Sequence, residues 1–228
     1  MIFGLINSGY PILTMVAIMI AFFSALLICM PFHEFAHAFV AGKEGDYTAR
    51  AMKRYTLAPF AHVDLSGFLL LLFFGIGYAK PVPVDLRNLR RGRKSEILVA
   101  IAGVITNLIL GILSALIYGL LLNVWPALFV SYGFLSWLYA AFFEYMVFLN
   151  FMFAFFNILP IYPLDGFRIV EACTKPNNGY VEFMKRYSFF IILAILLTSV
   201  LDIYLQYTGY WLGEHFIEWF KQLFGLIF

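Results

Sequence analysis

Apolar residues dominate four long stretches of the chain, and most of the charged residues lie between these stretches. The stretches run from about Pro11 to Val40, from Ile97 to Val124, from Phe134 to Leu159 and from Tyr187 to Leu205. A helix needs about 20 mostly apolar residues to cross a bilayer. The pattern therefore predicts an all-α polytopic membrane protein with four transmembrane helices, the first of them kinked at Pro31.

Basic residues flank these stretches in a regular way. They follow the first span, precede the second, follow the third and precede the fourth: Lys43, Arg50, Lys53 and Arg54; Arg87, Arg90, Arg91, Arg93 and Lys94; Arg168 and Lys175; Lys185 and Arg186. Because basic loops stay in the cytosol, all four clusters are predicted to face that side.

Two further segments complete this topology. The apolar stretch Leu65–Tyr78 is too short for a plain span. It is either re-entrant or a further span, and we favour re-entrant because a crossing there would place the basic cluster around Arg91 outside the cell. Trp211–Phe228 mixes Glu214, Glu218 and Lys221 with apolar and aromatic residues and predicts an amphipathic helix at the membrane interface.

Composition supports lipid as part of the solvent. Hydrophobic residues make up 63% of the chain and charged residues 12%, with a mean hydropathy of +0.89. Soluble domains average roughly 45–50% apolar residues and about 25% charged residues. A net charge of +2 gives no indication of a nucleic-acid partner. No basic residue precedes Lys43, so residues 11–30 are expected to remain as a span and not to be removed as a signal peptide. The whole chain, 1–228, is interpreted as a single membrane-embedded domain.

The first apolar stretch contains an HExxH motif, formed by His33, Glu34 and His37. Positions i and i+4 share one face of a helix, so both imidazoles can reach one zinc ion, with Glu34 beside the remaining coordination position. A carboxylate between two histidines is costly in lipid unless a metal or a partner compensates it. The motif therefore predicts a zinc site with Glu34 as the catalytic base.

A zinc ion held by two histidines needs a third protein ligand and an open position for water. Glu144 lies towards the outer half of the third apolar stretch, whereas Asp165 lies at its inner end, at the depth of the two histidines. Pro160 and Pro163 interrupt the backbone before Asp165, and irregular backbone is tolerated in membranes where it lines a polar cavity. Depth therefore favours Asp165 as the third ligand.

These motifs together resemble the site-2 protease family of intramembrane zinc metalloproteases. The residues that carry the resemblance are Phe32–Ala38, Gly77–Val84, Ala102–Asn107 and the Asn157–Gly166 stretch, which reads NxxPxxPLDG. The similarity covers roughly residues 20–175. Val104 departs from the pattern, because relatives commonly have proline after this glycine.

The resemblance implies a three-helix proteolytic core at about residues 11–175, one Zn²⁺ per chain and transmembrane proteins as substrates. It implies that Asn157 lies near the site and touches substrate, although an interhelical hydrogen bond would explain an asparagine there equally well. Asn107 and Asn150 are expected to be interhelical contacts. Compactness and the resemblance indicate a member without PDZ or CBS domains in the cytoplasmic membrane, and the basic loops indicate an active site towards the cytosol.

Two other functions compete with this interpretation. A different membrane zinc protease, acting on soluble or lipidated peptides, would take Glu144 or Glu171 as its third ligand. A non-catalytic metal-binding membrane protein, such as a transporter or a scaffold, would have no need of Glu34.

Overall fold

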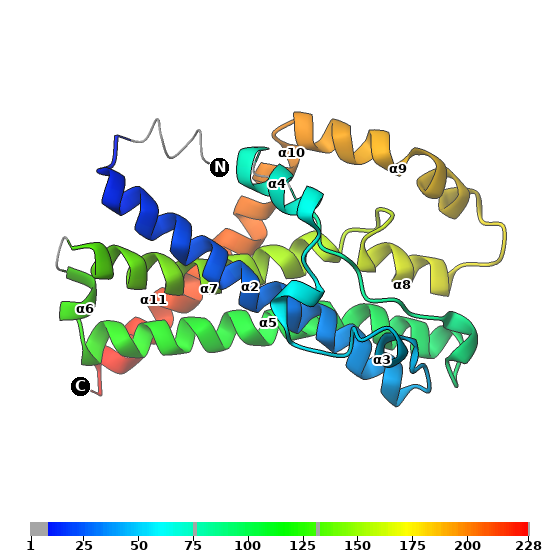
Figure 1. Ribbon diagram of the computed structural model, residues 1–228, viewed down its shortest axis with the longest axis horizontal. Helices are drawn as coiled ribbons and strands as arrows, with labels where there is room; N and C mark the ends of the chain where they lie inside the picture. Colours follow the sequence, from blue (N-terminus) through cyan, green and yellow to red (C-terminus); the bar gives the residue numbers. More distant parts are fainter. Residues whose placement is uncertain (1–8, 75–76, 131–132, 228) are drawn as a thin grey trace.

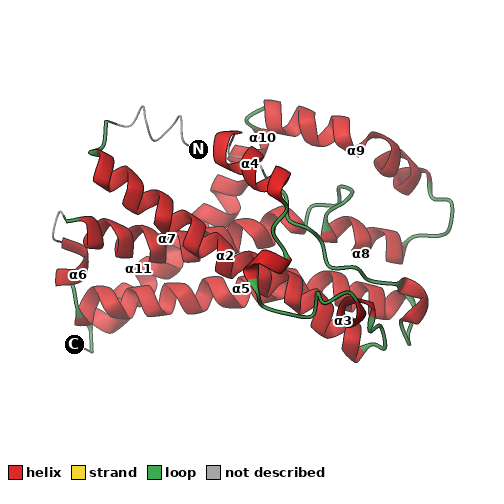
Figure 2. Cartoon of the chain, in the orientation of Figure 1, coloured by secondary structure: helices red, strands yellow, loops and turns green. Residues whose placement is uncertain are grey.

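Three long helices form the centre of the computed structural model, which describes residues 9–74, 77–130 and 133–227. They are α2 (Ile12–Lys43), α5 (Arg93–Val124) and α7 (Phe134–Asn157), and each is long and apolar enough to cross a membrane. All three pack against one another (Figure 1). The described chain is helical apart from turns, loops and one isolated β-bridge (Figure 2). The prediction of an all-helical polytopic membrane protein is confirmed.

Small residues allow the close approach of α2 and α5. In α2 a buried stripe repeats every four residues and consists of Ala17, Ala21, Ala25, Cys29, His33, His37 and Ala41. In α5 a similar buried stripe consists of Ser95, Val99, Gly103, Asn107, Gly111, Ala115 and Gly119. Association of helices in lipid depends on such packing, because lipid tails are as apolar as leucine side chains. The HExxH histidines continue the α2 stripe and therefore face the inside of the bundle.

α2 continues as one helix through Pro31 and is longer than a bilayer requires. Its 32 residues extend over about 48 Å, against a hydrocarbon core of about 30 Å. His33 and His37 lie in the part of the helix nearer to its basic end at Lys43.

The Leu65–Tyr78 stretch contains a short helix, and its two ends lie close together. α4 (Leu65–Phe74) has 10 residues and a length of about 15 Å, too little to cross a membrane. Ser66 Oγ lies 2.6 Å from the hydroxyl of Tyr78, and Val63 forms an antiparallel bridge with Ala79. Residues 75–76 lie outside the described residues. The meeting of the two ends supports the re-entrant interpretation.

The region of the predicted fourth span differs from a straight helix. α9 (Gly179–Leu197) is followed, after a bend of 76°, by a helical run from Val200 to Gly225. That run comprises α10 (Val200–Leu205), a π-helical turn (Gln206–Tyr210) and α11 (Trp211–Gly225). At the break, the Thr198 hydroxyl donates to the Ile195 carbonyl, a local bond that competes with continued helix.

The predicted interfacial helix also differs from expectation, because α11 lies along α5 and α7 in the bundle (Figure 1). Phe220 belongs to a buried cluster with Ala115, Val147 and Phe151. A Cβ atom at Gly119 would lie 2.7 Å from Cβ of Phe220, so glycine permits this close contact. The charged positions of α11 suggested an exposed face, and its apolar residues pack against α5 and α7 in the assembled bundle.

The basic clusters gather at one end of the bundle, at the right of Figure 1. There the end of α2 meets the start of α5, since Arg91 pairs with Glu44, and Lys185 of α9 pairs with Glu171 of α8 (Asp165–Cys173). Hydrogen bonds from Arg91 and Ser95 hold the pKa of Glu44 below its usual value. The remaining short elements are α3 (Thr48–Ala51), α6 (Ala127–Val130) and two 3-10 turns, Pro59–Ala61 and Leu86–Asn88.

Candidate metal centre

His33 and His37 point the same way from consecutive turns of α2. Their Nε2 atoms lie 3.0 Å apart, and the two side chains are buried. The Nδ1 atom of His37 lies 2.7 Å from the backbone carbonyl of Val99 in α5. Since a carbonyl only accepts, the neutral imidazole of His37 carries its proton on Nδ1, and its Nε2 presents a lone pair.

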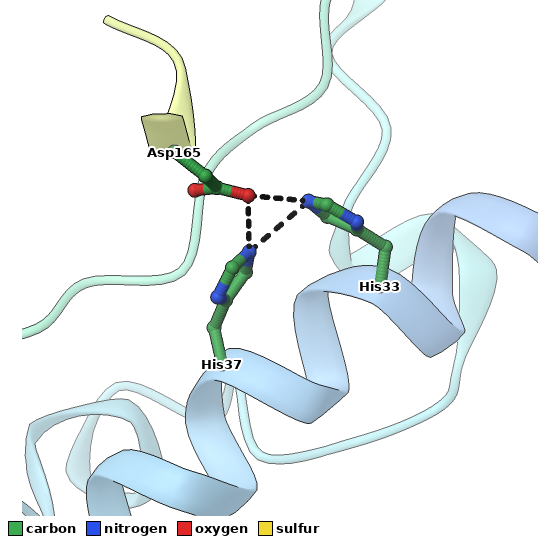
Figure 3. Close-up of side chains that lie close together, drawn as sticks. All are labelled: His33, His37 and Asp165. Atoms are coloured by element: carbon green, nitrogen blue, oxygen red, sulfur yellow. Dashed lines mark hydrogen bonds and ion pairs between the residues drawn. The ribbon is translucent and has the colours of Figure 1, made fainter. Parts of the chain in front are cut away.

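Asp165, the first residue of α8, completes the cluster (Figure 3). Its Oδ2 atom lies 3.2 Å from His33 Nε2 and 3.1 Å from His37 Nε2. Gly166 makes this placement possible, because a Cβ atom there would collide with the Ile158 carbonyl at the end of α7.

The three atoms fit a metal ion. They all lie within 4.8 Å of one another, and Asp165 Oδ2 is buried without a hydrogen-bond partner. Two ligands at about 2.0–2.1 Å from a tetrahedral zinc are separated by about 3.3 Å, close to the 3.0–3.2 Å separations of these atoms. A cation would resolve the repulsion between converging lone pairs. Two nitrogens and one carboxylate oxygen are a donor set that suits zinc.

Gly103 brings the backbone of α5 directly onto the imidazoles. A Cβ atom at this position would lie 2.5 Å from His33 Cε1 and 2.5 Å from His37 Nε2. Any larger residue would therefore displace both rings, so this position has room for glycine alone.

Glu34 is held by the segment that follows α4. Its carboxylate accepts a hydrogen bond of 2.8 Å from the backbone N–H of Val82. Pro81 and Pro83 have no N–H, so Val82 carries the one backbone donor among these three residues. The same segment begins with a pairing in which Lys80 N–H donates to the His62 carbonyl. Glu34 thus lies beside the histidines and is hydrogen-bonded to the segment that contains Val82.

The other carboxylates weighed from the sequence lie elsewhere. Glu144 accepts a long contact of 3.4 Å from the Tyr118 hydroxyl, and Glu171 pairs with Lys185. The structure brings Asp165, and neither of these two, to the pair of imidazoles.

Asn157 ends α7 and is half-buried, with its amide donating to the Phe153 carbonyl one turn earlier. Within the described part of the chain, no hydrogen bond joins it to the metal cluster.

Asn107 has a partner that sequence analysis missed. Its Oδ1 atom lies 2.5 Å from Nδ1 of His33. The four-residue spacing from Gly103 is the signal that could have placed it beside the histidines, once α5 was known to face α2.

Comparisons with known proteins agree with this chemistry. The family model described as peptidase family M50 matches residues 126–199. YwhC of Bacillus subtilis (strain 168) is 35% identical over 77% of this chain and 79% of its own. Rip2 of Mycolicibacterium smegmatis (strain ATCC 700084 / mc(2)155) is 28% identical over 87% of this chain and 75% of its own.

A more distant relative is the zinc metalloprotease MJ0392 of Methanocaldococcus jannaschii, which is 24% identical over 72% of this chain and 37% of its own. YwhC and Rip2 are also named as zinc metalloproteases. No solved structure matches the chain.

Proposed function

Since this chain belongs to peptidase family M50, the site-2 proteases, and is a zinc metalloprotease, we propose that it hydrolyses peptide bonds within or near transmembrane segments of other proteins. The observation that carries the proposal is the position of the cluster formed by His33, His37 and Asp165. Two of its members are buried in α2, a helix long and apolar enough to cross a membrane. This position supports a scissile bond at membrane depth.

We assign His33, His37 and Asp165 as ligands of one Zn²⁺ per chain. When bound, zinc supplies a Lewis acid that lowers the pKa of water and polarises the scissile carbonyl. Glu34 accepts the proton of the attacking water and passes it to the leaving amine. The Val82 N–H holds the Glu34 carboxylate in place for both transfers.

The substrate helix has to open before it can be cut, because its backbone hydrogen bonds shield the peptide bonds. The Tyr78–Val84 segment lies next to Glu34 and offers an extended edge to which an unwound substrate strand can be added. Pro81 and Pro83 are tolerated on such an edge. Asn157, at the end of α7, is the residue we assign to contact with the substrate.

The test of this function combines metal analysis with cleavage of defined substrates. We expect purified protein to contain about one zinc per chain and to cut model transmembrane substrates in detergent or liposomes within their apolar stretch. Chelation should stop cleavage, and added zinc should restore it. The matched control is the same scissile sequence as a short soluble peptide. Cleavage of that peptide alone would indicate a membrane zinc protease of another type, and a protein without zinc would contradict the proposal.

We also propose that the protein is a single domain in the cytoplasmic membrane. The basic end of its bundle then faces the cytosol. A single cysteine at Arg91, in a Cys29→Ala, Cys173→Ala background, should resist a membrane-impermeant thiol reagent in intact cells and react after the cells are opened. The control cysteine replaces Asn123, at the opposite end of α5. Reaction of the Arg91→Cys variant in intact cells would contradict this orientation.

A further inference from the structure

Four buried side chains from three helices form one continuous chain of hydrogen bonds that ends on His33. From His33 Nδ1 the chain runs to Asn107 Oδ1 at 2.5 Å, from Asn107 Nδ2 to Asn150 Oδ1 at 2.8 Å, and from Asn150 Nδ2 to Cys29 Sγ at 2.9 Å. Asn107, Asn150 and Cys29 are fully buried. Water cannot replace a lost hydrogen-bond partner there without a free-energy cost, so the neighbours of each amide decide which way its oxygen and its NH₂ group point.

The direction of these hydrogen bonds is determined at Asn150, the amide farther from His33. The Asn150 amide nitrogen lies 2.6 Å from the backbone carbonyl of Met146 as well as 2.9 Å from Cys29 Sγ. A backbone carbonyl can only accept, so the Asn150 NH₂ group must face it. Turning this amide over would set two oxygens against each other. Asn150 therefore presents its oxygen to Asn107.

The same reasoning passes along α5 to the histidine. Asn107 must offer its NH₂ group to the Asn150 oxygen, which leaves the Asn107 oxygen facing His33 Nδ1. That oxygen can only accept, so Nδ1 of His33 carries the proton. In the neutral imidazole, Nε2 of His33 then carries a lone pair, which points at Asp165 and His37.

The two histidines thus reach the same tautomer by different means. His37 is fixed by a backbone carbonyl, that of Val99, whereas His33 depends on side chains. A metal ligand of this kind needs its second nitrogen bonded to an acceptor that fixes the orientation and tautomer of the ring. Simple cross-linking of helices, the role expected for these asparagines from the sequence, would not require the amides to point in one particular direction.

We propose that Asn107 and Asn150 are positioning residues. The Met146 carbonyl fixes the orientation of the Asn150 amide, which fixes that of Asn107, and Asn107 in turn keeps the Nε2 lone pair of His33 directed at the metal position. This inference rests on the proposed zinc site, since it concerns the orientation of one of its ligands.

Zinc affinity, measured by competition with a chelator, tests the first consequence. Asn107→Leu keeps the branched shape of the side chain but removes both bonds, and it should weaken zinc binding by about 10–100-fold. Asn150→Leu should weaken it less, because Asn107 keeps its contact with His33 but is free to turn over. Cys29→Ala is the matched control. Cys29 lies one turn from His33, and its replacement leaves the bond from Asn150 Nδ2 to the Met146 carbonyl intact. The zinc affinity should therefore stay at the wild-type level.

A nitrogen-15 NMR measurement of the ring N–H groups in zinc-loaded protein separates positioning from simple packing. Wild type should show hydrogen-bonded Nδ1–H signals for both His33 and His37. In Asn107→Leu the His33 signal should move or vanish by exchange with solvent, while the His37 signal, whose partner is Val99, should stay in place.

Two results would overturn the inference: a His33 Nδ1–H signal that Asn107→Leu leaves unchanged, or a loss of affinity in Asn107→Leu no larger than in Cys29→Ala. The proposed function fails in a different way, because wild-type protein would then bind no zinc before any variant is compared.

Discussion

Glu34→Gln should abolish proteolysis while leaving zinc bound. Glutamine has nearly the same shape, and its amide oxygen can still accept the Val82 N–H that now bonds Glu34. It cannot accept a proton from water, however, and loss of a general base costs about 10²–10⁴-fold in rate. Initial rates of cleavage of a model transmembrane substrate would fall by that amount or more, whereas elemental analysis would show the zinc content of wild type.

Glu44→Gln provides the control for this substitution. Glu44 follows the last residue of the same helix and bonds Arg91 and Ser95, away from the metal cluster. We expect this variant to cleave at the wild-type rate. A Glu34→Gln protein that cleaves as fast as Glu44→Gln would show that another group takes the proton. Loss of zinc from Glu34→Gln would instead make Glu34 part of the metal site.

The part of the fold that could be predicted from the sequence is the part governed by local rules. Length and apolar content identified α2, α5 and α7 to within a few residues, and the i, i+4 spacing placed His33 and His37 on one helix face. The re-entrant interpretation of Leu65–Tyr78 came from charge and length, and the contact between Ser66 and Tyr78 supports it. Such features depend on the solvent and on helix geometry alone.

Features that depend on tertiary fit could not be predicted in this way. The four-residue stripes of α2 and α5 are visible in the sequence, but nothing in either stripe says that it faces the other. Nor does the sequence say that α11 packs against α5 and α7, so its amphipathic pattern suggests the membrane interface. Asn107 likewise has several partners open to it until Gly103 is placed against the imidazoles.

The choice of Asp165 by depth is an intermediate case. Two prolines and a glycine indicated irregular backbone near the inner end of the third span. They did not indicate how the chain would turn. Gly166 allows the start of α8 to lie against the Ile158 carbonyl, just after α7, and the carboxylate of Asp165 then lies beside His33 and His37.

Asp165→Ala should lose zinc and, with it, proteolysis. The substitution removes one of three converging ligand atoms and leaves the two imidazoles without the negative charge that offsets a bound dication. Loss of a residue that only orients a ligand costs about 10–100-fold in metal affinity, so loss of a ligand should cost more. Chelator competition and elemental analysis of the purified variant would measure this.

The matched variant is Glu144→Ala, because Glu144 is the other carboxylate near the third span and its contact is with Tyr118. It should retain the zinc content of wild type. The reverse pattern, with zinc kept in Asp165→Ala and lost in Glu144→Ala, would place the metal near Glu144 and favour the protease of another type. Because Asp165 Oδ2 lies 3.1–3.2 Å from both imidazoles and lacks a hydrogen-bond donor, the geometry leads us to expect the first pattern.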